Sequence, residues 1–233
     1  MNKIKIYFQR ITIGIALVIF SCGMLYSFTI LQNEKKPEII TSTDLNEGSQ
    51  EWSINKEINT EFIGSLKFEN GLIEENIVQT KDNEKYLALS WDLKESSHGA
   101  AFMDYRNSQD DQNMIIYAHY VYKDESLMFG PLHQLIQQEN YEENSVIHLQ
   151  LENEIRKYKV AYVYYYEMDN PTLEYFHTNY DKDYFDFYLE SIKNKAFYDT
   201  GLEITKNDKL LTLQTCVRDR EDLRLIVVAK EIS

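Results

Sequence analysis

A lone cysteine near the C-terminus is the residue in this sequence with the clearest potential for chemistry. Cys216 ends the run KLLTLQTC, which the charged segment VRDREDL (217–223) separates from Arg224 at the start of a second apolar run. Alternate side chains of a strand share a face, which gives two sets: Thr212, Gln214 and Cys216, and Leu211, Leu213 and Thr215. If the two runs pair as an antiparallel hairpin, Cys216 and Arg224 become neighbours.

A cysteine nucleophile needs a thiolate, a proton carrier for the leaving group and donors directed at a developing oxyanion. An arginine can donate to the oxyanion, and its charge favours the thiolate. The proton carrier would be a histidine, and only His119 ends a strongly apolar run, NMIIYAH. The other four lie in amphipathic segments or polar loops: His133, His148, His98 and His177. The sequence therefore indicates thiol chemistry at Cys216, His119 and Arg224.

Each of these residues also has an ordinary structural interpretation. A lone cysteine at a strand end is most often a small buried hydrophobe, and a strand-end histidine or arginine is often a solvated surface residue. Histidine pairs with metal-ligand spacing, CxxC motifs and glycine-rich phosphate loops do not occur in the sequence. The combination favours thiol chemistry over these other chemistries, with no metal or organic cofactor called for.

The charge of the chain argues against one large class of partner. The sequence has 24 Lys and Arg against 38 Asp and Glu, a formal net charge of −14, and no cluster of basic residues. Nucleic-acid binding depends on clustered Lys and Arg that neutralise phosphates. We therefore expect no nucleic-acid partner.

The first 31 residues differ from the rest of the chain. Residues 11–31 carry no charge and are long enough for a helix across a hydrocarbon core of about 30 Å, and Lys3, Lys5 and Arg10 precede them without any acidic residue. We expect a cytoplasmic N-terminus over 1–10, a transmembrane signal anchor over 11–31, and the rest of the chain outside the cell as a single-pass membrane protein.

Two other interpretations of the apolar segment stay open. A removable signal peptide cleaved after Gly23 would use Ser21 and Gly23 as its small residues. A lipoprotein site at Cys22 is disfavoured by Phe20. All three interpretations export the domain, and an exported domain usually pairs its cysteines. Because the domain contains Cys216 alone, it cannot form an internal disulfide.

The remaining pattern predicts one mainly β domain. Residues 32–50 are polar and are interpreted as a linker, and residues 51–233 as the folded domain, with weak helical character at 51–59. Apolar alternation and β-branched or aromatic enrichment predict seven or eight short strands. They lie in these segments: two within 62–80, then 100–106, 113–120, 145–152, 154–167, 209–216 and 224–233. This spacing is typical of a closed barrel or a sandwich.

Three helical or turn segments are expected between these strands. Residues 81–92 predict a short helix or turn. Residues 129–141 predict a short helix with one apolar face, made of Leu132, Leu135 and Ile136. Residues 181–197 predict a longer helix with an apolar stripe, made of Tyr184, Phe187, Tyr188 and Ile192.

Several of these motifs together resemble one family. TLQTC at 212–216, followed by Arg224, resembles the TLxTC…R signature of sortases, the cysteine transpeptidases of Gram-positive cell surfaces. The stretch HGAAFMDYRNSQDDQNMIIYAHYVYKDESLMFGPL, 98–132, is similar to the central region of class B sortases, and the helix expected at 183–196 is similar to their insertion. The resemblance covers about residues 60–233. It implies a closed eight-stranded β-barrel with a few peripheral helices, preceded by one transmembrane helix.

The resemblance also implies roles for individual residues. Cys216 would be the nucleophile, His119 the general acid/base, and Arg224 the group that stabilises the oxyanion and the bound signal peptide. Four further residues are expected to contact the substrate: Asn83 and Leu87 of DNEKYL, Tyr117 two residues before the histidine, and Thr215 of TLQTC. Three positions depart from the family pattern: Ala118 stands for Gly, Gln214 stands where many class B members have Ser, and ENIVQ lacks a proline. The departures bear on peptide specificity.

The activity implied by the resemblance is transpeptidation at the cell surface. The thiolate would attack the Thr carbonyl of a C-terminal sorting motif in a secreted protein. An amine of peptidoglycan, or of its lipid-linked precursor, would resolve the thioacyl enzyme, with hydrolysis as a slower side reaction. Two alternatives stay open: a sortase that polymerises pilin subunits through a lysine acceptor, and a non-catalytic wall-binding module on the same fold.

Overall fold

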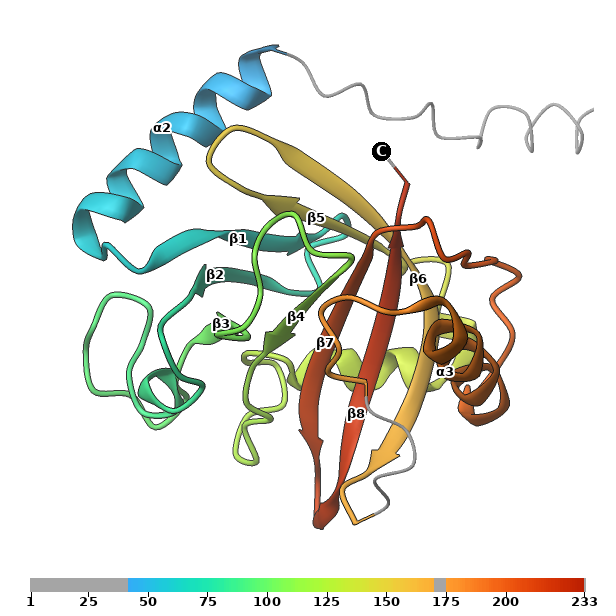
Figure 1. Ribbon diagram of the computed structural model, residues 1–233. Helices are drawn as coiled ribbons and strands as arrows, with labels where there is room; N and C mark the ends of the chain where they lie inside the picture. Colours follow the sequence, from blue (N-terminus) through green and yellow to red (C-terminus); the bar gives the residue numbers. More distant parts are fainter. Residues whose placement is uncertain (1–41, 170–174, 233) are drawn as a thin grey trace, which may run out of the picture. The chain divides into compact units, whose positions relative to one another are not determined.

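Eight strands form a closed barrel in the computed structural model, which describes residues 42–169 and 175–232. Around the barrel the order is β1-β2-β3-β4-β7-β8-β6-β5, and β5 pairs with β1 to close it (Figure 1). The strand bounds are β1 Phe62–Phe68, β2 Glu74–Val78, β3 Ala101–Met103, β4 Asn113–Tyr117, β5 Val146–Gln150, β6 Ile155–Glu167, β7 Leu210–Val217 and β8 Arg220–Glu231. The eight-stranded barrel implied by the resemblance is confirmed.

Within the described residues, two α-helices and three short 3₁₀ helices surround the barrel. Their bounds are α2 Ser42–Ile58, η1 Lys85–Leu87, η2 Gly130–Ile136, η3 Gln138–Asn140 and α3 Lys182–Lys195. None of the helices within the described ranges is long and apolar enough to span a bilayer. The proposed transmembrane segment 11–31 and most of the polar linker lie outside these ranges.

Helix α2 begins earlier than the sequence predicts. A polar linker was expected to extend to residue 50, with helical character only from 51, whereas the helix starts at Ser42. Trp52 of this helix donates from Nε1 to the carbonyl of Ile63 in β1 (3.3 Å), and Lys56 donates to the carbonyl of Phe62 (2.7 Å). A polar helix without a continuous apolar stripe has the same composition as a linker, so composition could not separate the two.

The barrel interior is filled by alternate residues of the strands. Leu211 and Leu213 of β7, Leu225 and Val227 of β8, and Ile116 of β4 all belong to one buried cluster. Their neighbours in sequence point to the outside of the barrel wall. A sheet that is apolar on both faces requires a second layer over its outer face.

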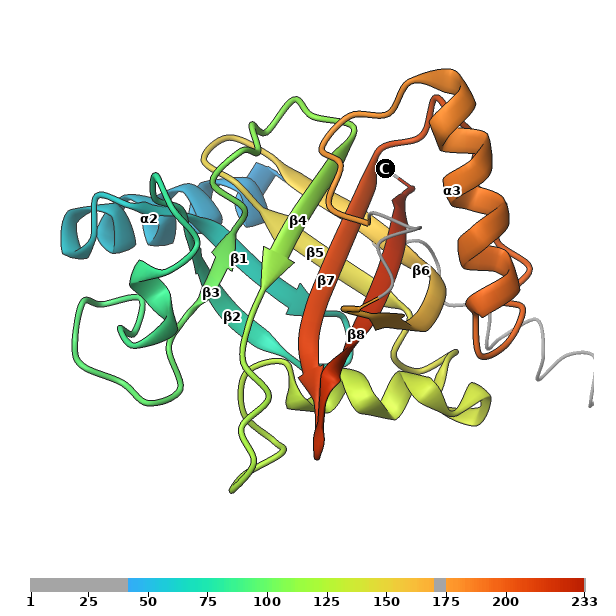
Figure 2. The same ribbon diagram turned by 60° about the horizontal axis from the view of Figure 1, so that its bottom comes forward.

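Helix α3 and the segment from Tyr175 to Tyr180 form this second layer against the outer faces of β6, β7 and β8 (Figure 2). Tyr162, Tyr164 and Tyr166 of β6 point into it. From α3 the buried residues are Phe185, Tyr188 and Ile192. The predicted stripe is therefore correct at Tyr188 and Ile192 but wrong at Phe187, which is 46% exposed, because the helix buries positions i, i+3 and i+7 starting from Phe185.

Candidate active site

Strands β7 and β8 form the antiparallel hairpin that the sequence predicts, and Cys216 is the cross-strand partner of Arg224. The predicted loop over 217–223 is wrong in its length, because β8 already begins at Arg220, which pairs with Val217. The register shift between Cys216 and Val217 leaves extra residues on β8 between Arg220 and Arg224, so the strand bulges before the arginine. Directly opposed side chains share a face of a sheet, so Arg224 lies beside Cys216.

Strand β4 brings His119 toward the other side of Cys216. β4 and β7 are parallel, Tyr117 pairs with Gln214, and the next residue, Ala118, donates its N–H to the Gln214 carbonyl (3.2 Å). Continued for two residues past the end of β4, this register brings His119 level with Cys216, so the strand pairing predicts that the two residues are neighbours. Alternation puts Tyr117 and His119 on the outer face that Gln214 and Cys216 share, because Ala118 points into the barrel. β7, which carries the thiol, thus lies between β4, which ends two residues before His119, and β8, which carries the arginine.

The ring orientation of His119 is set by one hydrogen bond. Its Nε2 lies 3.0 Å from the carbonyl oxygen of Leu87, in the 3₁₀ turn η1. Because a carbonyl only accepts, Nε2 must carry a proton in this contact. Nδ1 is then the ring nitrogen available for exchanging a proton with a reacting group. Leu87, predicted to contact substrate, is 44% exposed and also supplies this main-chain acceptor.

A glycine makes the approach of His119 to the η1 segment possible. Gly99 has a φ of +64°, and a Cβ on it would lie 2.4 Å from the Tyr86 carbonyl oxygen and 3.0 Å from Cδ2 of His119. Both the backbone conformation and the space therefore require glycine. This position fixes how closely the segment that carries the Leu87 acceptor packs against the histidine.

The guanidinium of Arg224 is held by main-chain carbonyls of its own strand. Nη1 donates to the carbonyls of Glu221 (2.9 Å) and Leu223 (2.8 Å), both in the bulged segment. The side chain is half-buried. Across the opposite edge of β8, Arg224 pairs with Tyr166 of β6. The bulge thus provides the acceptors that orient the cation next to Cys216.

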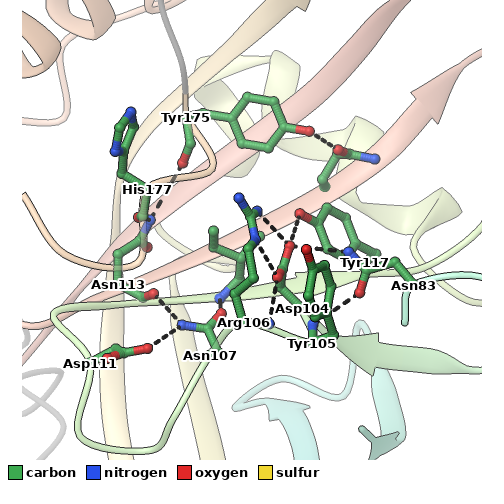
Figure 3. A network of polar contacts seen from close by, with 12 residues as sticks. Asn83, Asp104, Tyr105, Arg106, Asn107, Asp111, Asn113, Tyr117, Tyr175 and His177 are labelled. Atoms are coloured by element: carbon green, nitrogen blue, oxygen red, sulfur yellow. Dashed lines mark hydrogen bonds and ion pairs between the residues drawn. The ribbon is translucent and has the colours of Figure 1, made fainter. Parts of the chain in front are cut away.

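Asp104 connects two of the predicted substrate-contacting residues (Figure 3). Its carboxylate, which is fully buried, accepts from Tyr117 Oη (2.7 Å) and Asn83 Nδ2 (3.1 Å). Arg106 donates to it from its main-chain N–H, Nε and Nη2, at 2.9, 2.8 and 2.8 Å. Burial alone would raise the pKa of Asp104, but these hydrogen bonds and the Arg106 charge lower it to about 2. The side chain is an ionised acceptor at neutral pH.

The pKa of Tyr117 is raised well above the usual range of a phenol. Burial is the largest cause, followed by the neighbouring Tyr175 and the Asp104 charge. The hydroxyl therefore stays protonated and donates to Asp104. Asn83 is fixed at both ends of its amide, because its Oδ1 also accepts from the Tyr105 N–H (3.0 Å). Sequence reasoning proposed Asn83 and Tyr117 as substrate contacts but missed the carboxylate to which both donate.

The segment that begins at Tyr175 packs on the outer face of β7, at Gln214. The hydroxyl of Tyr175 donates to Oε1 of Gln214, two residues before Cys216 on the same face. Nδ2 of Asn113 donates to the carbonyl of His177 (2.9 Å), so β4 holds this segment as well (Figure 3). Gln214, where the family pattern often has Ser, is thereby hydrogen-bonded to the segment that begins at Tyr175.

Thr215 is a correction to the predicted substrate contacts. Its side chain is fully buried and belongs to the inward-facing set of β7 with Leu211 and Leu213. Its hydroxyl has no hydrogen-bond partner among the described residues. Because strand alternation turns it away from the face of Cys216, it packs in the barrel wall and does not face a substrate there.

The described ranges contain no group of three or more His, Cys, Asp or Glu side chains that could hold a metal ion.

Comparison with known proteins finds one family. A model of the sortase domain matches residues 70–232. Sortase B of Staphylococcus aureus (strain NCTC 8325 / PS 47) is 29% identical over 183 residues, which are 76% of this chain and 72% of that protein. Sortase B of Listeria monocytogenes serovar 1/2a (strain ATCC BAA-679 / EGD-e) is 27% identical over the same shares of the two chains.

Solved structures agree with this match. A mutant form of Clostridium perfringens sortase B superposes with a TM-score of 0.75 at 26% identity, covering 84% of this chain and 92% of that one. A complex of Staphylococcus aureus sortase B with a substrate gives a TM-score of 0.72 at 25% identity, covering 79% of this chain and 86% of that one.

Proposed function

This chain belongs to the sortase family, and on that premise we propose that it is a class B sortase that attaches secreted proteins to the cell wall. The substrate would be a C-terminal sorting motif, cleaved after Thr. The acceptor would be an amine of peptidoglycan or of its lipid-linked precursor. The observation that supports the proposal is the order of three strands: β7 carries Cys216 and pairs on one side with β4, which ends two residues before His119, and on the other side with β8, which carries Arg224.

In the proposed reaction each of the three residues has one task. The thiolate of Cys216 adds to the Thr carbonyl, and Arg224 donates to the oxyanion that develops. His119, whose Nε2–H is donated to the Leu87 carbonyl, takes the proton of the Cys216 thiol on Nδ1 and passes it to the leaving amine. A thioacyl enzyme and a free C-terminal fragment result.

The second half of the reaction reverses these roles. An acceptor amine attacks the thioester, His119 takes a proton from it, and the Cys216 thiolate leaves as the new amide forms. Water in place of the amine gives hydrolysis as the slower side reaction. Asn83, Leu87 and Tyr117 are proposed to line the groove for the sorting peptide.

The N-terminal part of the chain has a separate proposal. We propose that residues 11–31 anchor the protein in the cell membrane, with residues 1–10 in the cytoplasm and the barrel outside. Protease added to intact cells would then remove the barrel and leave an epitope tag on residue 1 protected. Degradation of the tag in intact cells contradicts this topology.

The test of activity uses the full chain in detergent micelles and its Cys216→Ala variant. Quenched fluorogenic peptides in which the residues around a fixed Thr are varied would be supplied with and without amine acceptors, and products identified by mass spectrometry. We expect cleavage after Thr and amine-dependent ligation by the wild type, and neither by the variant. Equal cleavage by both proteins, or cleavage of no peptide by the wild type, argues for a binding module instead.

A further inference from the structure

A second histidine, His133 in η2, contacts the proposed nucleophile through its main chain. Its Nε2 lies 3.0 Å from the carbonyl oxygen of Cys216. A carbonyl only accepts, so His133 donates in this contact. The carbonyl follows directly on the Cα that carries the thiol side chain, so this hydrogen bond restrains the backbone at the reactive residue.

The same short helix also holds the proposed base. Phe129, the residue that precedes η2, donates its N–H to the carbonyl of His119 (3.2 Å). The ring of His133 packs on the ring of Tyr120, the residue after His119, with centroids 4.8 Å apart. The segment from Phe129 to His133 thus contacts the main chains of His119 and Cys216, two of the three proposed catalytic residues.

Strand pairing alone does not hold these residues, because both lie where pairing ends or shifts. β4 ends at Tyr117, two residues before His119, and the β7–β8 register shifts directly after Cys216. η2 itself is firmly anchored, since Leu132 and Leu135 are fully buried in the barrel core. In Figure 2 its yellow-green coil lies by the end of β7 and β8 that carries the hairpin turn.

We propose that His133 is a positioning residue for the reaction: its Nε2–H, donated to the Cys216 carbonyl, sets the orientation of the thiol relative to His119. This proposal rests on the function proposed above. The ring is half-buried. Burial lowers the pKa of His133, against smaller raising effects of the Cys216 carbonyl and the Glu125 charge. A neutral ring with its proton on Nε2 serves this role without placing a second cation beside the site.

The test separates the donor from the ring. His133→Phe keeps a ring against Tyr120 and removes the donor, whereas His133→Gln keeps an amide donor and removes the ring. His148→Gln, on β5 at the far side of the barrel wall from β7, is the matched control. All variants are made in the full chain with Cys22→Ser, so that Cys216 is the only thiol.

The deciding measurement is the rate constant for alkylation of Cys216 by iodoacetamide from pH 5 to 9, at a temperature where thermal unfolding shows each variant folded. We expect His133→Phe to slow alkylation at pH 7 about tenfold, the equivalent of one ordinary hydrogen bond. His133→Gln should stay within about threefold of the wild type and His148→Gln should match it. With a cleavable peptide, the loss in His133→Phe should appear in kcat, with KM unchanged.

Alkylation does not depend on any peptide, so this result stands even if the proposed transpeptidation fails. Alkylation of His133→Phe within about twofold of the wild type, or an equal loss in His133→Phe and His133→Gln, overturns the proposal. If His133→Phe does not fold, His133→Leu takes its place as the variant without a donor.

Discussion

Asp104 illustrates how one buried charge can organise residues from separate segments. Its carboxylate receives five hydrogen bonds, from three donors on Arg106 and one each on Asn83 and Tyr117. A buried carboxylate is stable only when its desolvation is offset in this way. Because Asn83 and Tyr117 are proposed groove residues, Asp104 ties the shape of the groove to the stability of the fold.

Replacing Asp104 with Asn should therefore weaken both stability and peptide binding. The amide lacks the charge that Arg106 faces and puts a donor where donors already point, so we expect a loss of about 2–4 kcal/mol in the free energy of unfolding. KM for a cleavable peptide should rise more than kcat falls. Urea unfolding and steady-state kinetics measure the two effects.

The control for this variant is Asp110→Asn, a solvent-exposed aspartate in the same loop. It should change neither quantity.

The stabilisation by Asp104 is present above the unfolded pKa of 3.8 and is lost as pH falls toward about 2. A variant Asp104→Asn as stable as the wild type at pH 7 would contradict the role of the carboxylate.

Gly99 gives a second prediction at the scale of one residue. Gly99→Ala puts a methyl group against the Tyr86 carbonyl and the His119 ring, in a conformation that disfavours any side chain. We expect a loss of about 1–3 kcal/mol in stability and a clear loss of kcat, because the Leu87 carbonyl must move away from His119. Differential scanning calorimetry and peptide cleavage report these changes.

Gly71→Ala is the matched control, since Gly71 also has a positive φ, +79°, but a Cβ on it would meet nothing within 4 Å. It should lower stability through backbone strain while leaving kcat unchanged. Equal kcat losses in Gly99→Ala and Gly71→Ala would remove the link between Gly99 and His119.

At the scale of elements, we expect α3 to stabilise the outer layer without taking part in the reaction. Its N-cap is Asp181, whose side chain accepts from the Tyr184 N–H (2.9 Å), and its buried residues pack on the tyrosines of β6. Loss of an N-cap costs about 1 kcal/mol. Asp181→Ala should therefore lower Tm by a few degrees, with kcat and KM unchanged.

Asp186→Ala, at an exposed position within the same helix, removes an equal charge without removing a cap and should leave Tm nearly constant. A fall in kcat that exceeds the fall in folded fraction for Asp181→Ala would show that α3 has a part in the reaction.

For the molecule as a whole, the sequence predicted the barrel strands and the Cys216–Arg224 pairing because both depend on local alternation and on adjacent strands. The predictions that failed have physical causes. Thr215 was predicted to contact the substrate, although alternation along the strand places it with Leu213 on the inner face of the barrel wall. The roles of Asp104 and His133 depend on contacts between segments far apart in sequence, which no local pattern reports.

The pH dependence of global stability gives the last prediction. Glu75 lies on β2 and is half-buried, and desolvation raises its pKa to about 7, against one main-chain hydrogen bond from Met128. The folded protein therefore holds a proton on Glu75 that the unfolded chain releases near pH 4.5. The contribution of Glu75 to the free energy of unfolding is full below pH 4.5. It is lost as pH rises through about 7, where the half-buried carboxyl must ionise.

Glu75→Gln removes this penalty, because a neutral amide resembles the protonated acid and still accepts from the main chain. We expect the variant to be more stable than the wild type at pH 8 by about 1–2 kcal/mol, and about equal to it at pH 5. Urea unfolding at both pH values measures the difference. Glu74→Gln, its exposed neighbour in an ion pair with Lys67, should show no such pH dependence. A stabilisation by Glu75→Gln that is the same at pH 5 and pH 8 would mean that Glu75 does not titrate in this range.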